Sequence, residues 1–497
     1  MNKLNIMWFR DDLRVQDNTA LYQASQSQHP VVALYIVTPA QWQEHNLAPI
    51  QADFIARRLA CLQQQLQDLA VPLVILQGNT FSDIPDLFQH LLQQLPIAQV
   101  YANNQYIYNE NLRDNAVQQL LNTHDVSLTC YDDKCILPPG SVTTKTQQMY
   151  KVYTPFRNAW LQIYLQHQSS SCNVAPLPVP TFERQHQLAL IAASYDGFAS
   201  LVTSEVAFNY PRISSSDWPV TDADIAQQLS QFCEERVFDY ARQRDYPALP
   251  ATSRLSPYLA IGALSARQCL AALGLSLNFK QGAFWENKES GAFTWWNELV
   301  WREFYQHLSA AYPRLSKNKP FHQWAENLRW LHNASHLTAW QQGRTGFPIV
   351  DAAMRQLLHT GWMHNRLRMV VASFLTKELQ QDWRLGECWF MQHLIDGEFA
   401  ANNGGWQWSA STGVDAQPYF RIFNPTAQGK RFDADGEFIR QWVPELATVP
   451  NKYIHQPELW SGSISLDYPA PIIERKITRQ QTLTRFKQAK LQAEALR

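Results

Sequence analysis

The most constraining feature of the sequence is an alternation of short apolar runs with longer amphipathic stretches over the first 130 residues. The runs are rich in Val, Ile, Leu and Tyr, as is typical of strands buried on both faces. They are Leu4–Phe9, Val31–Val37, Pro72–Gly78, Gln99–Asn104 and Val126–Asp132. Stretches such as 52–69 and 109–121 separate them and have the periodicity of helices. This order predicts a five-stranded, doubly wound parallel sheet with right-handed crossovers. No GxGxxG or Walker motif follows a strand, so the usual dinucleotide and triphosphate sites are not expected.

Two regions of different character follow this α/β domain of residues 1–130. From 131 to 220 the chain contains Pro-Pro-Gly at 138–140, three serines at 169–171 and Pro-Leu-Pro-Val-Pro at 176–180, which predicts a long connector that wraps over the surface. From 221 to 497 helical periodicity predicts an all-α domain. Its candidate helices are Asp222–Gln243, Ser256–Leu273, Ala292–Tyr312, Ile349–Thr360, Met363–Gln381 and Gly386–Ile395. The basic, amphipathic segment 475–497 is most simply a solvated terminal helix.

Composition excludes several classes of protein. Charged residues make up only 17% and the net charge is -1, which argues against a coiled coil or a globally basic nucleic-acid coat but allows a local basic face. The seven cysteines show neither CxxC nor zinc-finger spacing, so we expect reduced thiols in a cytosolic protein and no metal site. We expect no signal peptide and no membrane span. The 18 tryptophans indicate a use of indole rings beyond packing.

The densest cluster of polar and aromatic residues is the segment 396–408, Asp-Gly-Glu-Phe-Ala-Ala-Asn-Asn-Gly-Gly-Trp-Gln-Trp. Asn-Asn-Gly-Gly is a typical stop signal for a helix, and spacing alone favours that interpretation. Two acids, two asparagines and two tryptophans in this short segment are more than a stop requires. A functional site is therefore the alternative.

A second cluster places Glu298, Trp301, Arg302 and Tyr305 on one helical face. This pattern fits an aromatic core stripe with an internal ion pair about as well as it fits a cavity wall. In a cavity wall, Trp301 would provide a stacking surface, and the carboxylate of Glu298 would accept a hydrogen bond from a ring N–H.

Two further clusters are more ambiguous. In the segment 361–369, His364 shares a helical face with Arg368, while Asn365 shares the next face with Met369. A lone histidine is more often a structural hydrogen-bonding residue, but these neighbours also suit contacts to an anion and a polarisable ring. Thr-Ser-Arg-Leu-Ser-Pro at 252–257 is typical of an ordinary helix N-cap and, alternatively, of a phosphate cradle.

In their order along the chain, these four clusters resemble the photolyase/cryptochrome family. The resemblance extends from Trp-Phe-Arg-Asp-Asp-Leu-Arg at 8–14 to Trp-Val-Pro-Glu-Leu at 442–446, which is nearly the whole chain. Within the family, the sequence is similar to class I cyclobutane pyrimidine dimer (CPD) photolyases of bacterial type. Asn365 and Met369 stand where (6-4) photolyases carry histidines, and Asn402 stands where plant cryptochromes have Asp and animal cryptochromes have Cys.

The resemblance implies a light-driven carbon–carbon lyase that repairs DNA with FAD. Photolyases are among the enzymes that flip their target bases out of the duplex. The electron would pass from excited, fully reduced FAD to the flipped-out dimer and return after the ring splits. The positions that match the family's FAD contacts in the helical domain are Tyr240, Thr252, Ser253, Arg254, Leu255, Ser256, Trp295, Arg302, Arg368, Asp396, Gly397, Glu398 and Asn402. We expect Arg368 to pair with Asp396, because an unpaired charge beside the flavin would be costly.

The resemblance also assigns residues that contact DNA and residues that re-reduce the flavin. Glu298 and Asn365 would hydrogen-bond the dimer beside Met369, while Trp301 and Trp408 would flank it. Residues matched to backbone phosphates are Arg244, Arg366 and Arg421. Residues matched to the family's photoreduction chain, which spacing alone would place in a core, are Trp406, Trp383 and Trp330.

His45, Asn109, Glu110 and Lys317 match contacts to a 5,10-methenyltetrahydrofolate antenna. Without the resemblance each would be a solvated polar residue, and a deazaflavin is the alternative pigment. We expect a monomer that acts on double-stranded DNA containing pyrimidine dimers, and also on single strands, in a bacterial cytoplasm with the nucleoid. The rival interpretations are a signalling cryptochrome, a DASH-type or (6-4) photolyase, and a flavin-free nucleic-acid-binding module.

Overall fold

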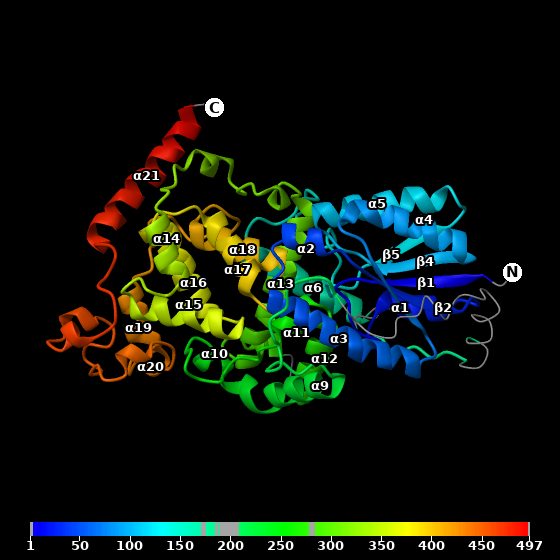
Figure 1. Ribbon diagram of the computed structural model, residues 1–497, viewed down its shortest axis with the longest axis horizontal. Coiled ribbons are helices and arrows are strands. Elements are labelled where there is room, and N and C mark those ends of the chain that lie inside the picture. The colour runs from blue at the N-terminus through cyan, green and yellow to red at the C-terminus, as the bar shows by residue number, and fades with distance from the viewer. Residues whose placement is uncertain (1–2, 170–174, 184–186, 188–207, 278–283, 496–497) are drawn as a thin grey trace.

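The N-terminal domain is built on a five-stranded parallel sheet with strand order β3-β2-β1-β4-β5. The structure is a computed structural model that describes residues 3–169, 175–183, 187, 208–277 and 284–495 (Figure 1). The strands are β1 (Leu4–Phe9), β2 (Val31–Val37), β3 (Leu73–Gln77), β4 (Ile97–Asn103) and β5 (Ser127–Tyr131). The predicted strands are confirmed with shifts of at most two residues at their ends.

Helices cover both faces of the sheet, as the continuous apolar strands require. They are α1 (Thr19–Ser25), α2 (Pro39–Glu44), α3 (Pro49–Asp68), α4 (Ile84–Gln94) and α5 (Tyr108–Asn122). Phe88 and Val117, on α4 and α5, pack with Trp8 on one face, while Leu21 and Phe54, on α1 and α3, pack on the other. The strand order reverses between β1 and β4, which is where ligands bind in sheets of this type.

The C-terminal domain is helical, as predicted. Its helices are α9 (Asp222–Gln231), α10 (Tyr240–Gln243), α11 (Ser256–Ala260), α12 (Ala266–Ser276), α13 (Gly291–Ala311), α14 (Ala334–Gln341), α15 (Pro348–Thr360), α16 (Asn365–Ser373), α17 (Trp383–His393), α18 (Phe399–Ala410), α19 (Pro425–Phe432), α20 (Glu437–Trp442) and α21 (Arg475–Ala495). π-Helical turns follow α9, at Phe232–Arg236, and α16, at Phe374–Glu378. Among the described residues, no helix is long and apolar enough to cross a membrane.

The prediction of a single helix over Ser256–Leu273 is wrong, because a non-helical turn separates α11 from α12. Gly262 adopts a φ of +67°, and a Cβ there would lie 2.1 Å from the backbone oxygen of Asp11. A glycine is therefore required where the helical domain meets the loop after β1.

The segment 131–220, predicted to wrap over the surface, contains a helix with one buried face, α6 (Tyr153–Ser169). Phe156 and Trp160 are fully buried and pack against α13. The indole N–H of Trp160 donates to Glu303 of α13 at 2.6 Å, and burial raises the pKa of that carboxyl to about 7. The surface prediction is wrong for this helix, since its aromatic side chains complete the core of the helical domain. Two of the three serines that suggested a linker, Ser170 and Ser171, lie outside the described residues.

A buried ion network joins the two domains. Arg267 of α12 pairs with Asp17 at 2.9 Å and with Asp133 at 2.7 Å, and Arg14 pairs with the second oxygen of Asp133. Burial alone would raise the pKa of Asp133, but the two guanidinium groups hold it well below its usual range. The network fixes the carboxyl ends of the strands against α12.

Candidate cofactor and substrate site

Two cavities lie near the domain boundary. One of about 630 Å³, the sheet-edge cavity, is lined by Trp8 and Thr38 at the carboxyl ends of the strands, and by residues of the helical domain. The other, the helical cavity, measures about 480 Å³ and lies among α13, α16 and α18. Glu398 and Ala260 line both, so the two cavities share a wall.

The helical cavity gathers residues from all four clusters. Those matched to FAD, to substrate or to the photoreduction chain that line it are Tyr240, Arg244, Thr252, Ser253, Arg254, Leu255, Ser256, Trp295, Glu298, Trp301, Arg302, Asn365, Arg368, Met369, Asp396, Glu398, Asn402, Trp406 and Trp408. Gly397 lines the sheet-edge cavity instead. Arg366, Arg421, Trp383 and Trp330 line neither cavity.

The Asn-Asn-Gly-Gly sequence lies inside α18, so its interpretation as a helix stop is wrong. A Cβ on Gly404 would lie 2.2 Å from the ring of Tyr305, whereas a Cβ on Gly405 would meet no atom within 4 Å. Gly404 therefore lets α18 approach α13 closely, and Gly405 leaves the helical cavity open. The helix ends later, at Ser411, where φ is +62°.

Gly404→Ala is expected to destabilise the protein by about 1–3 kcal/mol, because the added methyl group forces Tyr305 or α13 to shift. The matched control is Gly405→Ala, which adds the same methyl group where no atom opposes it. Urea unfolding should show a lower midpoint for Gly404→Ala than for Gly405→Ala. Equal midpoints would show that the contact between α18 and Tyr305 of α13 leaves room for a methyl group at position 404.

Two ion pairs stand in the wall of the helical cavity. Arg368 pairs with Asp396 at 2.8 Å, as the sequence predicted, and the Asp396 side chain is only 2% exposed. Arg302 pairs with Glu398 at 3.0 Å. Lys134 contacts the same carboxylate oxygen of Glu398, at 3.1 Å. Asp396 and Glu398 are therefore both neutralised by cations, and Lys134, which lines the sheet-edge cavity, is a contact that the sequence motifs did not reveal.

The polar residues of α18 are held by α17. The amide nitrogen of Asn402 donates to the backbone oxygen of Glu387 at 3.0 Å, which leaves its side-chain oxygen available to a ligand. Asn403 donates to the Glu387 carboxyl at 2.7 Å and accepts from Gln407 at 2.9 Å. Burial raises the pKa of Glu387 to about 7.

The segment 252–257 forms one side of the helical cavity. The N-cap of α11 is Leu255 and makes no side-chain capping bond, so the expected Ser or Thr cap is absent from this helix. Arg254 has a φ of +53°. Its guanidinium lies between the rings of Trp218 and Trp362, at 4.6 and 5.1 Å. The two indoles fix the strained turn, so the backbone of the segment has a defined position at the cavity.

Most of the residues matched to DNA contact other side chains of the protein. Glu298 forms an ion pair with Arg244, and Arg366 pairs with Asp245 at 2.6 Å. Arg421 lies exposed in the loop after α18. Trp301 stacks on Tyr153 of α6 at 3.5 Å and 8°. The sequence motifs gave no signal for Tyr153, because it precedes Trp301 by 148 residues. The packing of α6 on α13 creates the contact between the two rings.

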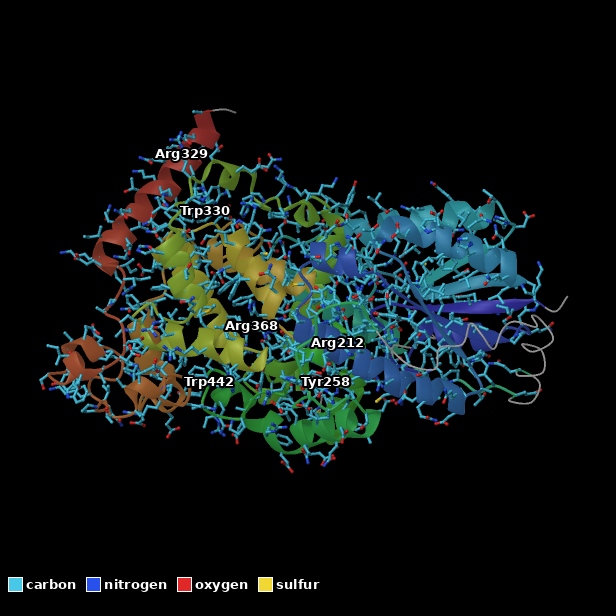
Figure 2. All side chains as sticks on the ribbon, viewed as in Figure 1. Arg212, Tyr258, Arg329, Trp330, Arg368 and Trp442 are labelled. Atoms are coloured by element: carbon cyan, nitrogen blue, oxygen red, sulfur yellow. The ribbon has the colours of Figure 1, made fainter. Side chains whose placement is uncertain are left out.

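Three tryptophans follow one another from the helical cavity to the last helix. Trp406 and Trp383 are buried, and Trp330 is half-buried. A Cβ on Gly386, one turn after Trp383, would lie 2.0 Å from the Trp406 ring. The backbone N–H of Leu331 donates to Gln380 at 2.8 Å, which brings Trp330 beside the start of α17. Figure 2 shows Trp330 next to α21. The centre of its ring lies 6.4 Å from the centre of the Phe486 ring.

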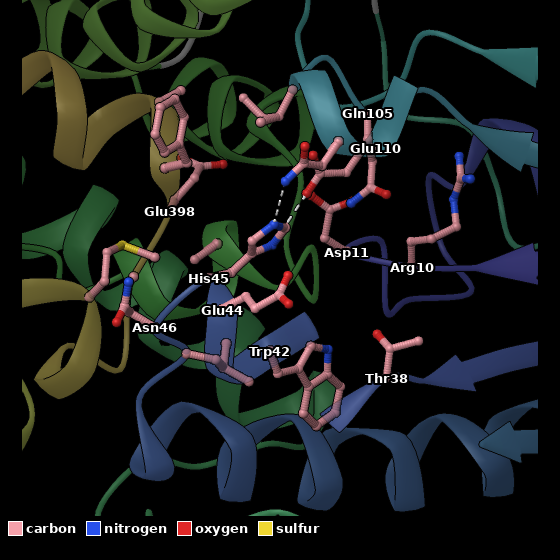
Figure 3. A pocket seen from close by; sticks show the side chains of 18 of the residues that line it. Arg10, Asp11, Thr38, Trp42, Glu44, His45, Asn46, Gln105, Glu110 and Glu398 are labelled. Atoms are coloured by element: carbon pink, nitrogen blue, oxygen red, sulfur yellow. Dashed lines mark hydrogen bonds and ion pairs between the residues drawn. The ribbon is translucent and has the colours of Figure 1, made fainter. Parts of the chain in front are cut away.

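The sheet-edge cavity receives three of the four residues matched to an antenna, as seen in part in Figure 3. Asn109 contacts the His45 ring at 3.0 Å, and His45 lies 3.8 Å from Glu110. Lys317 does not line the cavity; its ammonium lies 3.9 Å from the centre of the Tyr108 ring.

Buried polar atoms without partners show that both cavities suit polar ligands. In the helical cavity they are Arg302 Nε and Trp406 Nε1, and in the sheet-edge cavity they are Arg10 Nε, Gln51 Oε1, Glu110 Oε2 and Ser316 Oγ. The helical cavity has the size of a cofactor site and offers several cations, acids and indoles. Its residues therefore fit FAD.

Comparison with known proteins agrees with this geometry. Residues 5–181 match the family model described as "DNA photolyase", and residues 295–488 match the "FAD binding domain of DNA photolyase". The chain is 50% identical over 488 residues to the deoxyribodipyrimidine photo-lyase of Vibrio cholerae, covering 98% of this chain and 100% of the relative. It is 46% identical over 492 residues to the enzyme of the same name from Escherichia coli, covering 98% and 99%.

Solved structures of photolyases and a cryptochrome are also similar to this chain. A class III photolyase from Agrobacterium tumefaciens superposes with a TM-score of 0.77 and 32% identity, covering 99% of this chain and 98% of the other. A cryptochrome from Synechocystis, at 24% identity and a TM-score of 0.81 over 97% and 99% of the chains, shares the fold. With both family models matched and relatives similar over almost its full length, this chain belongs to the photolyase/cryptochrome family.

Proposed function

We propose that the protein is a class I photolyase that splits cyclobutane pyrimidine dimers in DNA. The observation that carries this function is the helical cavity, where Glu298, Trp301, Asn402 and Trp408 stand together with four arginines. Bound FAD, when fully reduced and excited by light, supplies the electron that opens the cyclobutane ring and takes it back afterwards. The chain's own residues supply binding, orientation and charge balance.

On the cofactor side, the residues matched to FAD line the cavity as a group. Arg302 and Arg368 hold Glu398 and Asp396 in place, which fixes the acids that would face the flavin ring and ribityl chain. The side-chain oxygen of Asn402 would accept a hydrogen bond from the flavin N5 side. Tyr240 and the segment 252–256 would hold the phosphates, while Trp295 closes the same end by donating to Ser253 at 3.3 Å.

On the substrate side, the dimer would enter from the duplex and stack against indoles. Trp301 has one face covered by Tyr153, so a base can stack only on its other face. Trp408 would flank the dimer from α18, and Met369 would pack against it. Glu298 and Asn365 would bind the polar edges of the bases, with Arg244, Arg366 and Arg421 on the phosphates. Such binding suits single strands as well as duplexes.

The tryptophans from Trp406 through Trp383 to Trp330 would conduct electrons from the surface to the helical cavity. Trp330→Phe is expected to slow light-driven reduction of bound flavin, because phenylalanine is far harder to oxidise and the path then ends at buried Trp383. Absorbance during blue illumination measures the rate. Repair after chemical reduction of the flavin should equal that of the wild type. Equal photoreduction in variant and wild type would exclude Trp330 from the path.

The sheet-edge cavity would bind an antenna, with 5,10-methenyltetrahydrofolate as the proposed pigment. His45, Asn109 and Glu110 form one connected polar group there, and Lys317 would join them. An absorption band that survives bleaching of the flavin, followed by extraction of the pigment, distinguishes a folate from a deazaflavin.

The direct test of the proposed function is light-dependent repair. The protein is expected to restore an oligonucleotide with one thymine dimer under light, to leave a (6-4) lesion unchanged, and to do nothing in the dark. Bound flavin without repair would instead assign a signalling cryptochrome.

We also propose that the protein acts as a monomer in the cytoplasm, with the nucleoid. Its proposed division is an antenna domain at 1–130, a connector at 131–220 and a catalytic domain at 221–497.

A further inference from the structure

The basic C-terminal helix has no part in the activity proposed above. The sequence alone suggested that this helix, α21, is solvated, but Phe486 is 1% exposed and Ala489 is 2% exposed. These two residues pack with Ala325 and Leu328 in a small core of their own. The helix therefore has a fixed place on the helical domain, and its charged side chains project from a defined part of the surface.

Polar contacts tie α21 to the wall of the helical cavity. Thr478 donates to Glu378 at 2.6 Å, and Arg475 pairs with the same carboxyl at 2.7 Å. Thr482 donates to the backbone oxygen of Lys377 at 2.6 Å. Lys377 and Glu378 belong to the π-helical turn that continues α16, the helix that carries Arg368 and Met369 into the cavity.

One flank of α21 is basic. At 3.6 residues per turn, four of the six basic side chains of the helix fall within an arc of about 80° next to the buried face. These four are Lys476, Arg479, Lys487 and Lys490, and Glu494 in the last turn is the one acidic residue of α21 in the same arc. The first three are exposed. In the described part of the chain, none of these three lies within ion-pair distance of a carboxylate. Arg479 also acts electrostatically on Glu378, so the charges of Lys476 and Lys487 are the ones most available to an anion.

This basic flank continues from the mouth of the helical cavity. Gln417 donates through its backbone N–H to Trp408, a cavity residue, at 3.2 Å. Two residues further, Tyr419 stacks on Phe486 of α21 at 5.7 Å and 5°. The ammonium of Lys490 lies 4.7 Å from the centre of the Tyr419 ring. The loop that follows α18, up to Arg421, thus joins the cavity to the basic flank, along the edge of the molecule that α21 forms in Figure 1.

We propose that the basic flank of α21 binds the phosphate backbone of the DNA that extends from the lesion on one side. This inference rests on the proposed function and adds a second contact region to it. The charge is complementary to phosphate, and the surface is continuous with the cavity that would receive the dimer. From Lys476 to Lys490 the helix rises about 21 Å, which corresponds to about six base pairs of duplex.

The test variant is Lys476→Gln with Lys487→Gln, which removes two exposed charges and leaves Lys490 on Tyr419. Its matched control is Lys3→Gln with Arg212→Gln, two exposed cations of the N-terminal half (Figure 2 labels Arg212). Binding is measured against salt concentration for a 30-base-pair duplex with a central thymine dimer, and for a trinucleotide dimer that is too short to reach α21. Flavin absorbance and thermal unfolding verify that both variants are folded.

For the α21 variant, the salt slope of log K on the duplex is expected to fall by about two, one for each lost phosphate contact, while trinucleotide binding stays unchanged. The control variant should match the wild type on both substrates. An unchanged slope, or an equal fall in the control, would overturn the role of α21 while leaving dimer repair intact. Failure of the wild type to repair either substrate in light would instead reject the proposed function.

Discussion

Replacing Arg368 with methionine is expected to yield protein that has lost most of its FAD. Arg368 neutralises Asp396, whose side chain is 2% exposed. In the empty cavity, water can solvate the orphaned carboxylate, but a bound flavin excludes that water. The penalty therefore falls on the FAD complex. Leaving a buried charge unpaired costs about 3 kcal/mol or more, which weakens FAD binding by roughly 100-fold.

The ratio of flavin to protein absorbance after purification measures this loss, and titration of the apoprotein with FAD gives the affinity. Arg355→Met is the matched control, because it breaks the Arg355–Glu445 pair, also at 2.8 Å, which lines neither cavity. The control should keep its flavin. Arg368→Lys should recover part of the binding, since it restores the charge without the planar guanidinium. A yellow Arg368→Met protein with wild-type affinity would show that the pair does not support the cofactor.

Arg267→Met is expected to destabilise the whole protein by about 3–5 kcal/mol, because Asp17 and Asp133 lose their shared partner in the buried boundary between the domains. Methionine retains most of the packing volume, so the lost charge accounts for the change. Urea unfolding should show a markedly lower midpoint. Arg242→Met is the control, since it breaks the surface pair with Asp239 and the Arg242 side chain is 81% exposed. That change should cost about 0.5 kcal/mol or less.

The effect of Arg267→Met should depend on pH in one direction. Because the pKa of Asp133 is lower in the folded protein than in the unfolded chain, its ion pairs stabilise the fold above the unfolded value of about 3.9. This stability is lost as the pH falls further toward the folded pKa. The difference between wild type and variant should therefore be full at pH 7 and shrink below about pH 4. A difference that stays constant on acidification would mean that packing, and not charge, carries the effect.

Local pattern was sufficient for the N-terminal sheet. The apolar runs are short, continuous and separated by amphipathic helices, and β1 and β2 begin and end at the predicted residues. The periodicity reports burial directly, because a strand covered on both faces has no polar positions to interrupt it. The residue types of the helical cavity were also predictable, since its motifs lie in four short segments that resemble the family's own.

Tertiary structure decided what local pattern could not. The sequence around Gly404 is typical of a helix stop, yet this residue lies inside α18. Position 404 requires a glycine because Tyr305 of α13 occupies the space that a Cβ would need. Trp301 is stacked because α6, from a predicted surface connector, places Tyr153 on its face. The terminal helix is docked because Phe486 enters a pocket made by residues about 160 positions earlier. Periodicity tells which side of an element is buried, but which distant side chain fills the space against it depends on how the chain folds back on itself.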